Sequence, residues 1–299
     1  MESDNASSTP NQNLRQPDSL LAGLPIENRH LFLSIDRITL CGSFEDPERF
    51  LPRWEALFPD VPGRNSNGDA YRYSWIMDDY FFQALPFTKE KAHDARIDFN
   101  PNTIKNNQSF VAIMKMLRHS HLTRLDIAVD YVDIHDLSNF FLECLPKGRR
   151  PWHDPHTRKL KAVYFGSQKS TNLYRIYDKK RELREKKNID ADCETWWRVE
   201  AQMKLRSYDQ WENFPLFSDL IIAQPTYDGS ILPFPDLCIL KELHRDPTGL
   251  QHLTDYKRRK FGRLIKTSEH LETINQHPHT VITSNLEWLH NQITHYIGE

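Results

Sequence analysis

The amino-acid sequence predicts an α+β fold in which helices cover an antiparallel-rich sheet made of two ferredoxin-like halves, followed by a helical C-terminal region. Residues 123–131 and 195–204 alternate between apolar and polar side chains, which is typical of strands with one buried face. Shorter strand candidates alternate with helix candidates around them. Both halves of the chain also open in the order strand, helix, strand, strand, which suits two related sheet-forming units.

The first half of the chain provides three strand candidates and two helix candidates. Residues 32–40, FLSIDRITL, alternate well enough for a strand, and residues 46–57 predict a helix that begins at an acidic residue. The further strand candidates are YRYSWIM at residues 71–77 and ARIDF at residues 95–99. An Asn-Pro-Asn turn then precedes a helix whose apolar side chains recur at helical spacing as far as Leu117.

The clearest strands lie in the second half, where alternation assigns each side chain to a face. In the first of them the apolar face holds Leu125, Ile127, Val129 and Tyr131, and the polar face holds Arg124, Asp126, Ala128 and Asp130. In the second the apolar face holds Trp197, Val199, Ala201 and Met203, and the other face holds Trp196, Arg198, Glu200 and Gln202.

The sequence predicts three further features between these two strands. They are a helix at residues 137–145, a Pro/Gly/Arg-rich loop at residues 146–158, and a hairpin of strands at residues 161–166 and 172–178. A charged helix follows the hairpin. Beyond Leu205 the pattern is helical to the end, interrupted by a Pro-rich connection from 224 to 235.

The composition excludes several classes of protein. The formal net charge is -2 and 27% of the residues are charged, which is ordinary for a globular chain. No run approaches the roughly 20 apolar residues that a membrane-spanning helix needs, and the polar N-terminal stretch does not suit a secretory signal. The four cysteines lie far apart without a CxxC pair, so neither a zinc knuckle nor a disulfide framework is indicated. We expect a cytoplasmic protein.

Charged side chains stand in the middle of otherwise apolar strands, where burial is costly unless they are paired or bind a metal. The four predicted polar faces hold Asp126 and Asp130; Arg175 and Tyr177; Arg198 and Glu200; and Arg96 and Asp98. Carboxylates without neighbouring thiols or clustered histidines favour Mg²⁺ or Mn²⁺. Such an ion suits phosphodiester chemistry, in which arginines on the same surface would bind the phosphates. A simpler interpretation stays open, in which the carboxylates only pair with arginines on a solvated face.

Tyr177 is the candidate nucleophile of this constellation. A phenol has a reference pKa near 10, so it attacks poorly unless a metal or nearby cations stabilise its anion. Arg175 and Lys179 are the nearest cations in sequence. Tyr174 lies on the opposite face of the same strand, and we expect it to pack in the core.

Three segments, LTRLDIAVDY, YFGSQKSTNLYRIYDKKRE and WWRVEAQMK, resemble the Rep-trans family in their order and spacing. That family contains the rolling-circle replication initiators of small Gram-positive plasmids and has relatives among the relaxases of conjugative elements. The likeness to the staphylococcal plasmid initiators extends to SIDRITL, RIDFNPN and DYKRRKFGRLIK, so it covers most of the chain from about residue 31 to residue 266.

The resemblance implies a DNA nicking-closing enzyme. The tyrosine matched by Tyr177 attacks one origin strand, leaving a 5′-phosphotyrosyl link and a free 3′-OH that primes synthesis. Asp126 and Glu200 match the candidate ligands of the divalent metal, and Asp98, the third candidate, stands where the family has a Glu. Asp178 stands where some relatives have an Asn, which places a negative charge beside the nucleophile.

The resemblance also implies a homodimer that binds plasmid origin DNA and works with a separate helicase. Origin recognition would lie in the C-terminal basic segment, with the candidates Lys257, Arg258, Arg259, Lys260, Arg263 and Lys266. Contacts of this kind with phosphates make binding salt-dependent. Two alternatives stay open: a relaxase of a conjugative element with the same chemistry, and a non-catalytic DNA-binding regulator that keeps the fold.

Three segments therefore make up the predicted domain organisation. Residues 1–30 are polar and rich in Pro, Ser and Asn, which predicts a disordered segment. Residues 31–223 form the predicted nickase domain, with a possible duplication into ferredoxin-like (TBP-like) halves at 31–120 and 121–223. Residues 224–299 form the predicted helical region that carries the DNA-recognition segment.

Overall fold

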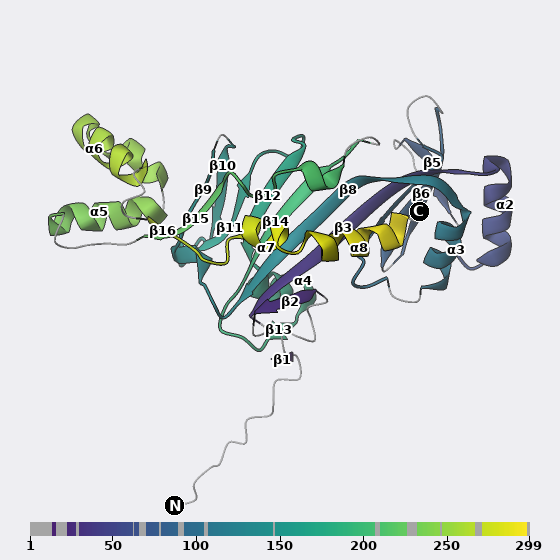
Figure 1. The fold of residues 1–299 in the computed structure, drawn as a ribbon, viewed down its shortest axis with the longest axis horizontal. Coiled ribbons are helices and arrows are strands. Elements are labelled where there is room, and N and C mark those ends of the chain that lie inside the picture. The colour runs from purple at the N-terminus through teal and green to yellow at the C-terminus, as the bar shows by residue number, and fades with distance from the viewer. Residues whose placement is uncertain are drawn as a thin grey trace, which may run out of the picture.

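The structure is a computed structural model. It describes residues 14–15, 23–27, 30–61, 63–65, 70–77, 79–88, 93–104, 107–145, 147–206, 210–225, 232–245, 247–266 and 271–297. An 11-stranded antiparallel sheet forms the centre of this part of the chain (Figure 1). The predicted α+β class is therefore confirmed. No helix in these ranges is long and apolar enough to span a membrane.

The strands of the central sheet follow one continuous order. From one edge to the other they are β10 (Arg149–His153), β11 (Leu160–Phe165), β12 (Asn172–Asp178), β14 (Trp196–Lys204), β8 (Leu117–Val132), β3 (Leu31–Phe44), β7 (Ala95–Phe99), β6 (Tyr80–Pro86), β5 (Tyr71–Ile76) and β4 (Arg64–Asn65). Strand β2 (Leu24–Glu27) pairs with β3 off this path. Strands β1 (Leu14–Arg15) and β13 (Asp190–Ala191) form a separate parallel pair.

The two halves of the sheet repeat one topology on either side of the long central strands β3 and β8, which pair with each other. After β3, the strands β5, β6 and β7 form a meander whose last strand returns beside β3. After β8, the strands β11, β12 and β14 do the same beside β8. The segments RID and RVE therefore occupy equivalent strands, β7 and β14. The domain boundaries and the duplication stay predictions. Residues Val281, Ile282, Leu289 and Ile293 of the predicted C-terminal region pack into the core of the central sheet.

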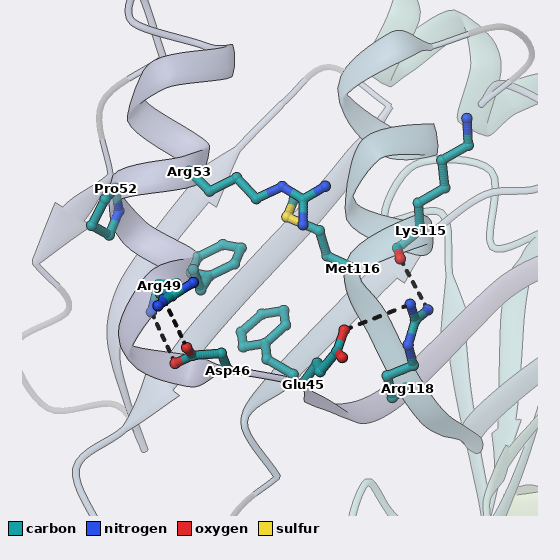
Figure 2. Close-up of a pocket in the computed structure, with 10 residues that line it drawn as sticks. Glu45, Asp46, Arg49, Pro52, Arg53, Lys115, Met116 and Arg118 are labelled. Atoms are coloured by element: carbon teal, nitrogen blue, oxygen red, sulfur yellow. Dashed lines mark hydrogen bonds and ion pairs between the residues drawn. The ribbon is translucent and has the colours of Figure 1, made fainter.

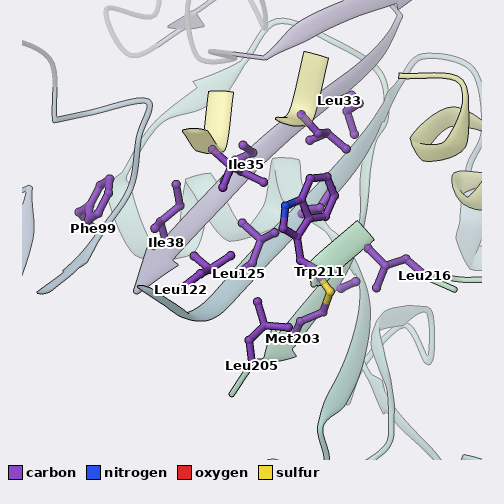
Figure 3. Packing of buried hydrophobic residues seen from close by; sticks show 14 of the residues in the cluster. Leu33, Ile35, Ile38, Phe99, Leu122, Leu125, Met203, Leu205, Trp211 and Leu216 are labelled. Atoms are coloured by element: carbon purple, nitrogen blue, oxygen red, sulfur yellow. The ribbon is translucent and has the colours of Figure 1, made fainter. Parts of the chain in front are cut away.

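Helices cover the apolar face of the sheet. These are α2 (Pro47–Leu57), α3 (Gln108–Met116), α7 (Pro278–Thr283) and α8 (Leu286–Ile297). Their buried residues, among them Trp54, Ile113 and Leu289, join one core with the alternating apolar residues of the strands. Figure 3 shows part of that core, which includes Leu125 of β8, Met203 of β14 and Trp211. Removing each such side chain from water contributes about 1.5–3 kcal/mol.

The opposite face of the sheet is covered only in part by the described helices. Helix α4 (Lys179–Lys187) and strand β13 bring Leu183 and Ala191 against Phe32, Val132 and Trp196, which closes one end of this face. The rest of this face carries the charged side chains of β8, β12 and β14. The fold therefore leaves a polar surface next to α4.

A smaller unit extends from one end of the sheet. Strand β15 (Leu220–Pro225) pairs with both β9 (Phe141–Cys144) and β16 (Leu271–Thr273). Between β15 and β16 the chain forms α5 (Phe234–Arg245), the 3₁₀ helix η3 (Pro247–His252) and α6 (Asp255–Lys266). Figure 1 shows α5 and α6 beyond the β9 end of the sheet, away from α2 and α3. Their core, around Phe261, includes Phe141 of β9.

The helix predicted at residues 137–145 is wrong. Only the 3₁₀ turn η1 (Leu137–Asn139) forms there, and β9 follows it. Phe141 packs against α5 and α6, whereas Leu142 packs into the main core. Consecutive side chains of a strand point in opposite directions, so Phe141 and Leu142 can enter two different cores. In a helix they would be rotated by only about 100° around the axis.

Other differences from the sequence prediction concern short strands. The predicted loop at 146–158 contains β10, and β6 has no counterpart among the predicted strands. The predicted helical pattern beyond Leu205 is broken by η2 (Trp211–Asn213), β15 and β16. Burial on both faces or an edge position removes the alternation that identifies a strand. Most of the predicted disordered segment, 1–30, lies outside the described residues.

Candidate active site

The polar faces of β8, β12 and β14 meet on one side of the sheet. Strand pairing places Arg175 opposite Glu200, Tyr177 opposite Arg198, and Gln202 opposite Asp126. Side chains of directly paired residues project from the same face. The structure thus brings together every site candidate that the sequence analysis placed on these three strands.

A cleft of about 470 Å³ opens over this face. The three strands contribute Arg124, Asp126, Arg175, Tyr177 and Glu200, and the neighbouring elements add Asp36, Arg37, Asp98, Lys179 and Glu182. Its lining contains both acidic and basic side chains. The cleft is therefore suited to bind a charged ligand, not an apolar one.

Asp126 and Glu200 are the two most deeply placed carboxylates of the cleft, each with 1% of its side chain exposed. Arg175 lies between them: its guanidinium donates to Glu200 and lies 3.4 Å from the Asp126 carboxylate. Arg124 donates to both oxygens of Asp126 at 2.8 and 2.6 Å. Burial raises the pKa of Asp126 despite the opposing effect of Arg124.

Tyr177 directs its hydroxyl toward the same carboxylate pair. Its Oη donates a hydrogen bond to Oε2 of Glu200 at 3.2 Å. Burial raises the pKa of the Tyr177 phenol well above its usual value, and the nearby Arg198 charge opposes that rise. The phenol is therefore held protonated, with a carboxylate in position to accept its proton.

Lys179 and Arg198 lie close to Tyr177, but both have acidic partners. Lys179 Nζ lies 5.7 Å from the Tyr177 ring centroid and donates to Glu182 at 2.7 Å. Burial lowers the pKa of Lys179, and so does the Arg198 charge. Arg198 donates to Asp130 at 2.8 and 2.9 Å and to Asp36 at 2.7 Å. Its charge therefore acts on Tyr177 from a fixed position.

Asp36 belongs to the site although the sequence analysis did not single it out. The register of β3 against β8 shifts between Ile35 and Arg37, so Asp36 is an extra residue in a β-bulge. The bulge lets Asp36 reach Arg198 while the adjacent Arg37 reaches Asp98 at 3.1 Å. Two consecutive polar residues inside the otherwise alternating SIDRITL are the signal that could have indicated it.

Asp98 lines the cleft but lies apart from the other two candidate metal ligands. It stands on β7, separated from β8 by β3. Strand spacing places its backbone roughly 10 Å from that of β8 and roughly 14 Å from that of β14. Its carboxylate pairs with Arg37 and accepts a hydrogen bond from Thr39 at 3.3 Å.

A divalent cation requires several oxygen ligands that converge on one point. In the ranges that the structure describes, no group of three or more His, Cys, Asp or Glu side chains is arranged to hold a metal. Asp126 and Glu200 alone converge, and the Arg175 guanidinium occupies the space between them. Two buried carboxylates fit Mg²⁺, which is commonly bound by one or two carboxylates together with substrate phosphates and water.

Asp178 has a structural role and is not among the described residues that line the 470 Å³ cleft. Its carboxylate caps helix α4 by accepting from the Arg181 backbone N–H at 2.9 Å. An Asn caps a helix equally well, so both residues found at this position can do the same work. Tyr174, by contrast, is 1% exposed in the core, where its hydroxyl accepts from the Phe217 N–H.

The predicted DNA-binding residues lie on α6 and divide into two groups. Arg258 donates to backbone carbonyls of Leu250, Gln251 and Leu253, and Lys260 donates to Asp236. Lys257, Arg259 and Arg263 are exposed. The side chain of Lys266 lies outside the described residues. Helix α6 is therefore basic, and two of its cations, Arg258 and Lys260, have partners within the protein, although Arg258 is also exposed.

A more voluminous cleft, of about 870 Å³, lies between α2 and the start of β8 (Figure 2). Arg49 pairs with Asp46 at 3.1 Å and Arg118 approaches Glu45 at 4.0 Å. No tyrosine stands among the described residues that line it. The smaller cleft at Tyr177 is the better candidate active site, because it combines a nucleophile, a proton acceptor and several cations.

Comparison with known proteins identifies relatives in one group. The model of a family described as "Replication initiation factor" (Rep_trans) matches residues 120–297. A replication initiation protein of Staphylococcus aureus is 26% identical over 243 residues, which are 78% of this chain and 75% of that protein. A second from the same organism is 29% identical over 174 residues, 57% of this chain and 54% of that protein. A solved rolling circle replication initiator from Geobacillus stearothermophilus aligns with a TM-score of 0.38 at 13% identity, covering 58% of this chain and 74% of that one.

Arg198→Met tests the buried ion pair. The change leaves Asp130, which is fully buried, with Trp196 as its one side-chain donor in the described structure. We expect the free energy of unfolding in urea to fall by about 3–5 kcal/mol, as for other broken buried pairs. The matched double variant Arg198→Met/Asp130→Asn should recover part of that loss. A loss below about 1 kcal/mol in the single variant would contradict a buried, uncompensated charge.

Asp178→Ala and Asp178→Asn test the helix cap. The alanine variant should lose about 0.5–2 kcal/mol of unfolding free energy, because the Arg181 N–H loses its acceptor. The asparagine variant should match the wild type, since its amide oxygen caps in the same way. Urea titrations of the three proteins measure both. Equal stability of the alanine variant would show that the cap contributes nothing.

Proposed function

We propose that this chain, which belongs to the Rep_trans family of replication initiation factors, starts rolling-circle replication of a plasmid by nicking one strand of the origin with Tyr177. The observation that carries the proposal is the hydrogen bond from the Tyr177 hydroxyl to buried Glu200 inside a cleft lined by arginines. The family model covers more than half of the chain, and the relatives from Staphylococcus aureus are replication initiation proteins.

The chemical step transfers a phosphoryl group without loss of the phosphodiester. Tyr177 Oη attacks the scissile phosphorus, so that an O–P bond to the tyrosine forms while the bond from phosphorus to the 3′-oxygen breaks. Glu200 takes the phenolic proton, and the departing 3′-oxygen takes a proton from solvent. The strand end is held as a 5′-phosphotyrosyl ester, and the free 3′-OH primes synthesis. The same step in reverse closes the nick.

The main obstacle to this step is the protonated state of the nucleophile. Burial raises the pKa of Tyr177, so the attack needs positive charge at the developing phenolate and at the phosphate. Arg198 lies opposite Tyr177 on the neighbouring strand and provides one fixed charge. Arg175 and Lys179 stand on the same wall of the cleft and can bind phosphate oxygens.

Divalent metal binding completes the proposal. Asp126 and Glu200 would hold Mg²⁺ or Mn²⁺ between them. They stand on the adjacent strands β8 and β14, whereas Asp98 stands on β7, beyond β3, which favours the first two as ligands. When bound, the ion would neutralise charge on the phosphate. Arg175 has to leave the space between the carboxylates, and its Nε is a buried donor without an acceptor among the described residues. Releasing Arg175 to the phosphate would give this donor a partner.

Recognition of the origin is assigned to helix α6. Tyr256, Arg259 and Arg263 follow helical spacing along one exposed face, opposite Phe261 and Ile265, which are buried. This face could contact duplex DNA while the cleft holds a single strand. A homodimer and a separate helicase remain part of the proposal, because the family resemblance implies them.

Tyr177→Phe should abolish the covalent protein–DNA adduct, because phenylalanine has no nucleophilic oxygen. The measurement is a denaturing gel of protein incubated with single-stranded origin oligonucleotide and Mg²⁺ or Mn²⁺. Tyr174→Phe is the control, since Tyr174 is buried in the core, where its hydroxyl accepts the Phe217 N–H, and it should retain the adduct. An adduct formed by Tyr177→Phe would exclude this nucleophile. Tight origin binding without any wild-type adduct would favour a non-catalytic regulator.

Asp126→Asn and Glu200→Gln should each weaken Mn²⁺ binding to the free protein, measured by electron paramagnetic resonance, and abolish nicking. Each change replaces a charged ligand by a neutral one of the same shape. Asp98→Asn should retain Mn²⁺ binding, because β3 separates Asp98 from Asp126. If Asp98→Asn lost Mn²⁺ binding while Asp126→Asn and Glu200→Gln retained it, the metal site would lie on the β7 side of the cleft.

A further inference from the structure

A third cleft, of about 840 Å³, lies between the candidate active site and the edge strand β10. Arg124 and Arg175 line both this cleft and the cleft at Tyr177, so the two are adjacent. We propose that this edge cleft binds the single-stranded DNA adjoining the scissile phosphate, with one base stacked on the indole of Trp152. The proposal rests on the nicking function of Tyr177 and specifies how its substrate strand is held.

Strand register places Trp152 in line with the nucleophile. Trp152 of β10 pairs with Ala162 of β11, which pairs with Tyr177 of β12. Directly paired residues project from the same face, so Trp152 stands two strand intervals, roughly 10 Å, from Tyr177. The residue between them is an alanine, and its small side chain leaves the path along the sheet open. A strand held at Tyr177 can therefore reach Trp152 within a short stretch.

The indole of Trp152 is exposed to solvent, whereas five other tryptophans of the chain are buried. Its relative exposure is 65%, whereas Trp54, Trp75, Trp196, Trp197 and Trp211 are buried. An exposed aromatic ring beside a charged groove is typical of single-strand binding sites, where bases stack on the ring irrespective of sequence. Tyr164 lies in the same cleft, paired with Arg150 on one side and Arg175 on the other.

The charge of the edge cleft fits a polyanion. Its lining includes Arg150 and Lys204, and none of the described residues that line it is an Asp or Glu. Arg124 and Arg175 also line it, but they pair with Asp126 and Glu200 at the candidate active site. Arg150 donates to the Gly166 carbonyl and Lys204 to the Gln168 carbonyl. Carbonyl oxygens fix the position of these two cations without neutralising them. Their full charge therefore stays available to phosphates.

The larger cleft beside α2 offers a contrast. Arg49 and Arg118 there approach Asp46 and Glu45, as Figure 2 shows. Carboxylates within ion-pair distance reduce the net charge that a phosphate would meet. That cleft also lies in the other half of the sheet and shares no lining residue with the cleft at Tyr177. The edge cleft is therefore the better path for the strand.

The test measures single-strand binding separately from nicking. Fluorescence anisotropy of fluorescein-labelled oligo(dT) with EDTA present reports affinity without metal-dependent cleavage. Base–aromatic stacking of about 1–3 kcal/mol per base predicts that Trp152→Ala weakens binding about 5- to 150-fold. Trp152→Phe should retain most of the affinity, whereas Trp152→Leu, which is apolar but has no ring, should not. The exposed Phe87 supplies a matched control, and Phe87→Ala should bind as the wild type.

The salt dependence of the same assay tests the cations. Arg150→Gln and Lys204→Gln should each reduce the slope of log affinity against log salt by about 0.7, the value expected for one lost single-strand phosphate contact. Arg53→Gln, in the cleft beside α2, should leave the slope unchanged. Wild-type affinity in Trp152→Ala, or equal affinity in the Leu and Phe variants, would overturn the proposal. If the protein formed no covalent adduct through Tyr177 but still bound oligo(dT) in a Trp152-dependent way, the nicking function would be rejected and the binding proposal would stand.

Discussion

The ion pair between Arg198 and Asp130 joins β14 to β8 where both side chains are almost completely buried. A slip of one residue between these strands would turn Arg198 toward the apolar core and leave Asp130 buried without its partner. On its other side β14 pairs with β12, and that register sets Tyr177 beside Arg198 and Arg175 beside Glu200. Because one arrangement satisfies all of these charges, the electrostatics that stabilise the sheet also determine where the nucleophile lies.

Sequence reasoning identified the elements whose periodicity is unambiguous. The strands β8, β12 and β14 alternate between apolar and polar side chains even though both faces of β14 are buried, and α2 and α3 each bury one stripe, so the periodicity of each element is visible in its sequence. Sequence reasoning failed where apolar side chains are buried on both sides of a strand, as at Phe141 and Leu142 of β9. It also failed at β10, an edge strand that contains Pro151. In such places tertiary contacts decide the structure, and local pattern carries little information about them.

The candidate site was predictable to the extent that it lies on regularly alternating strands. Alternation put Asp126, Arg175, Tyr177 and Glu200 on polar faces, and the family resemblance connected the strands. Asp36 was missed because its orientation depends on a β-bulge, which displaces the alternation by one residue. Asp98 was grouped with Asp126 and Glu200, since sequence gives no measure of the distance across β3. Trp152 was hidden in a segment predicted as loop, where no face can be assigned.

Helices α5 and α6 leave the fold and return to it at neighbouring positions, since Gln224 pairs with Glu272 and Pro225 with Leu271. A segment whose two ends meet on adjacent strands can be exchanged or resized without altering the path of the rest of the chain. Its contact with the body of the protein runs through Phe141. Exchange of this segment between related proteins would therefore replace α6, the helix that we propose to contact DNA, and leave the pairing of the strands around the cleft unchanged.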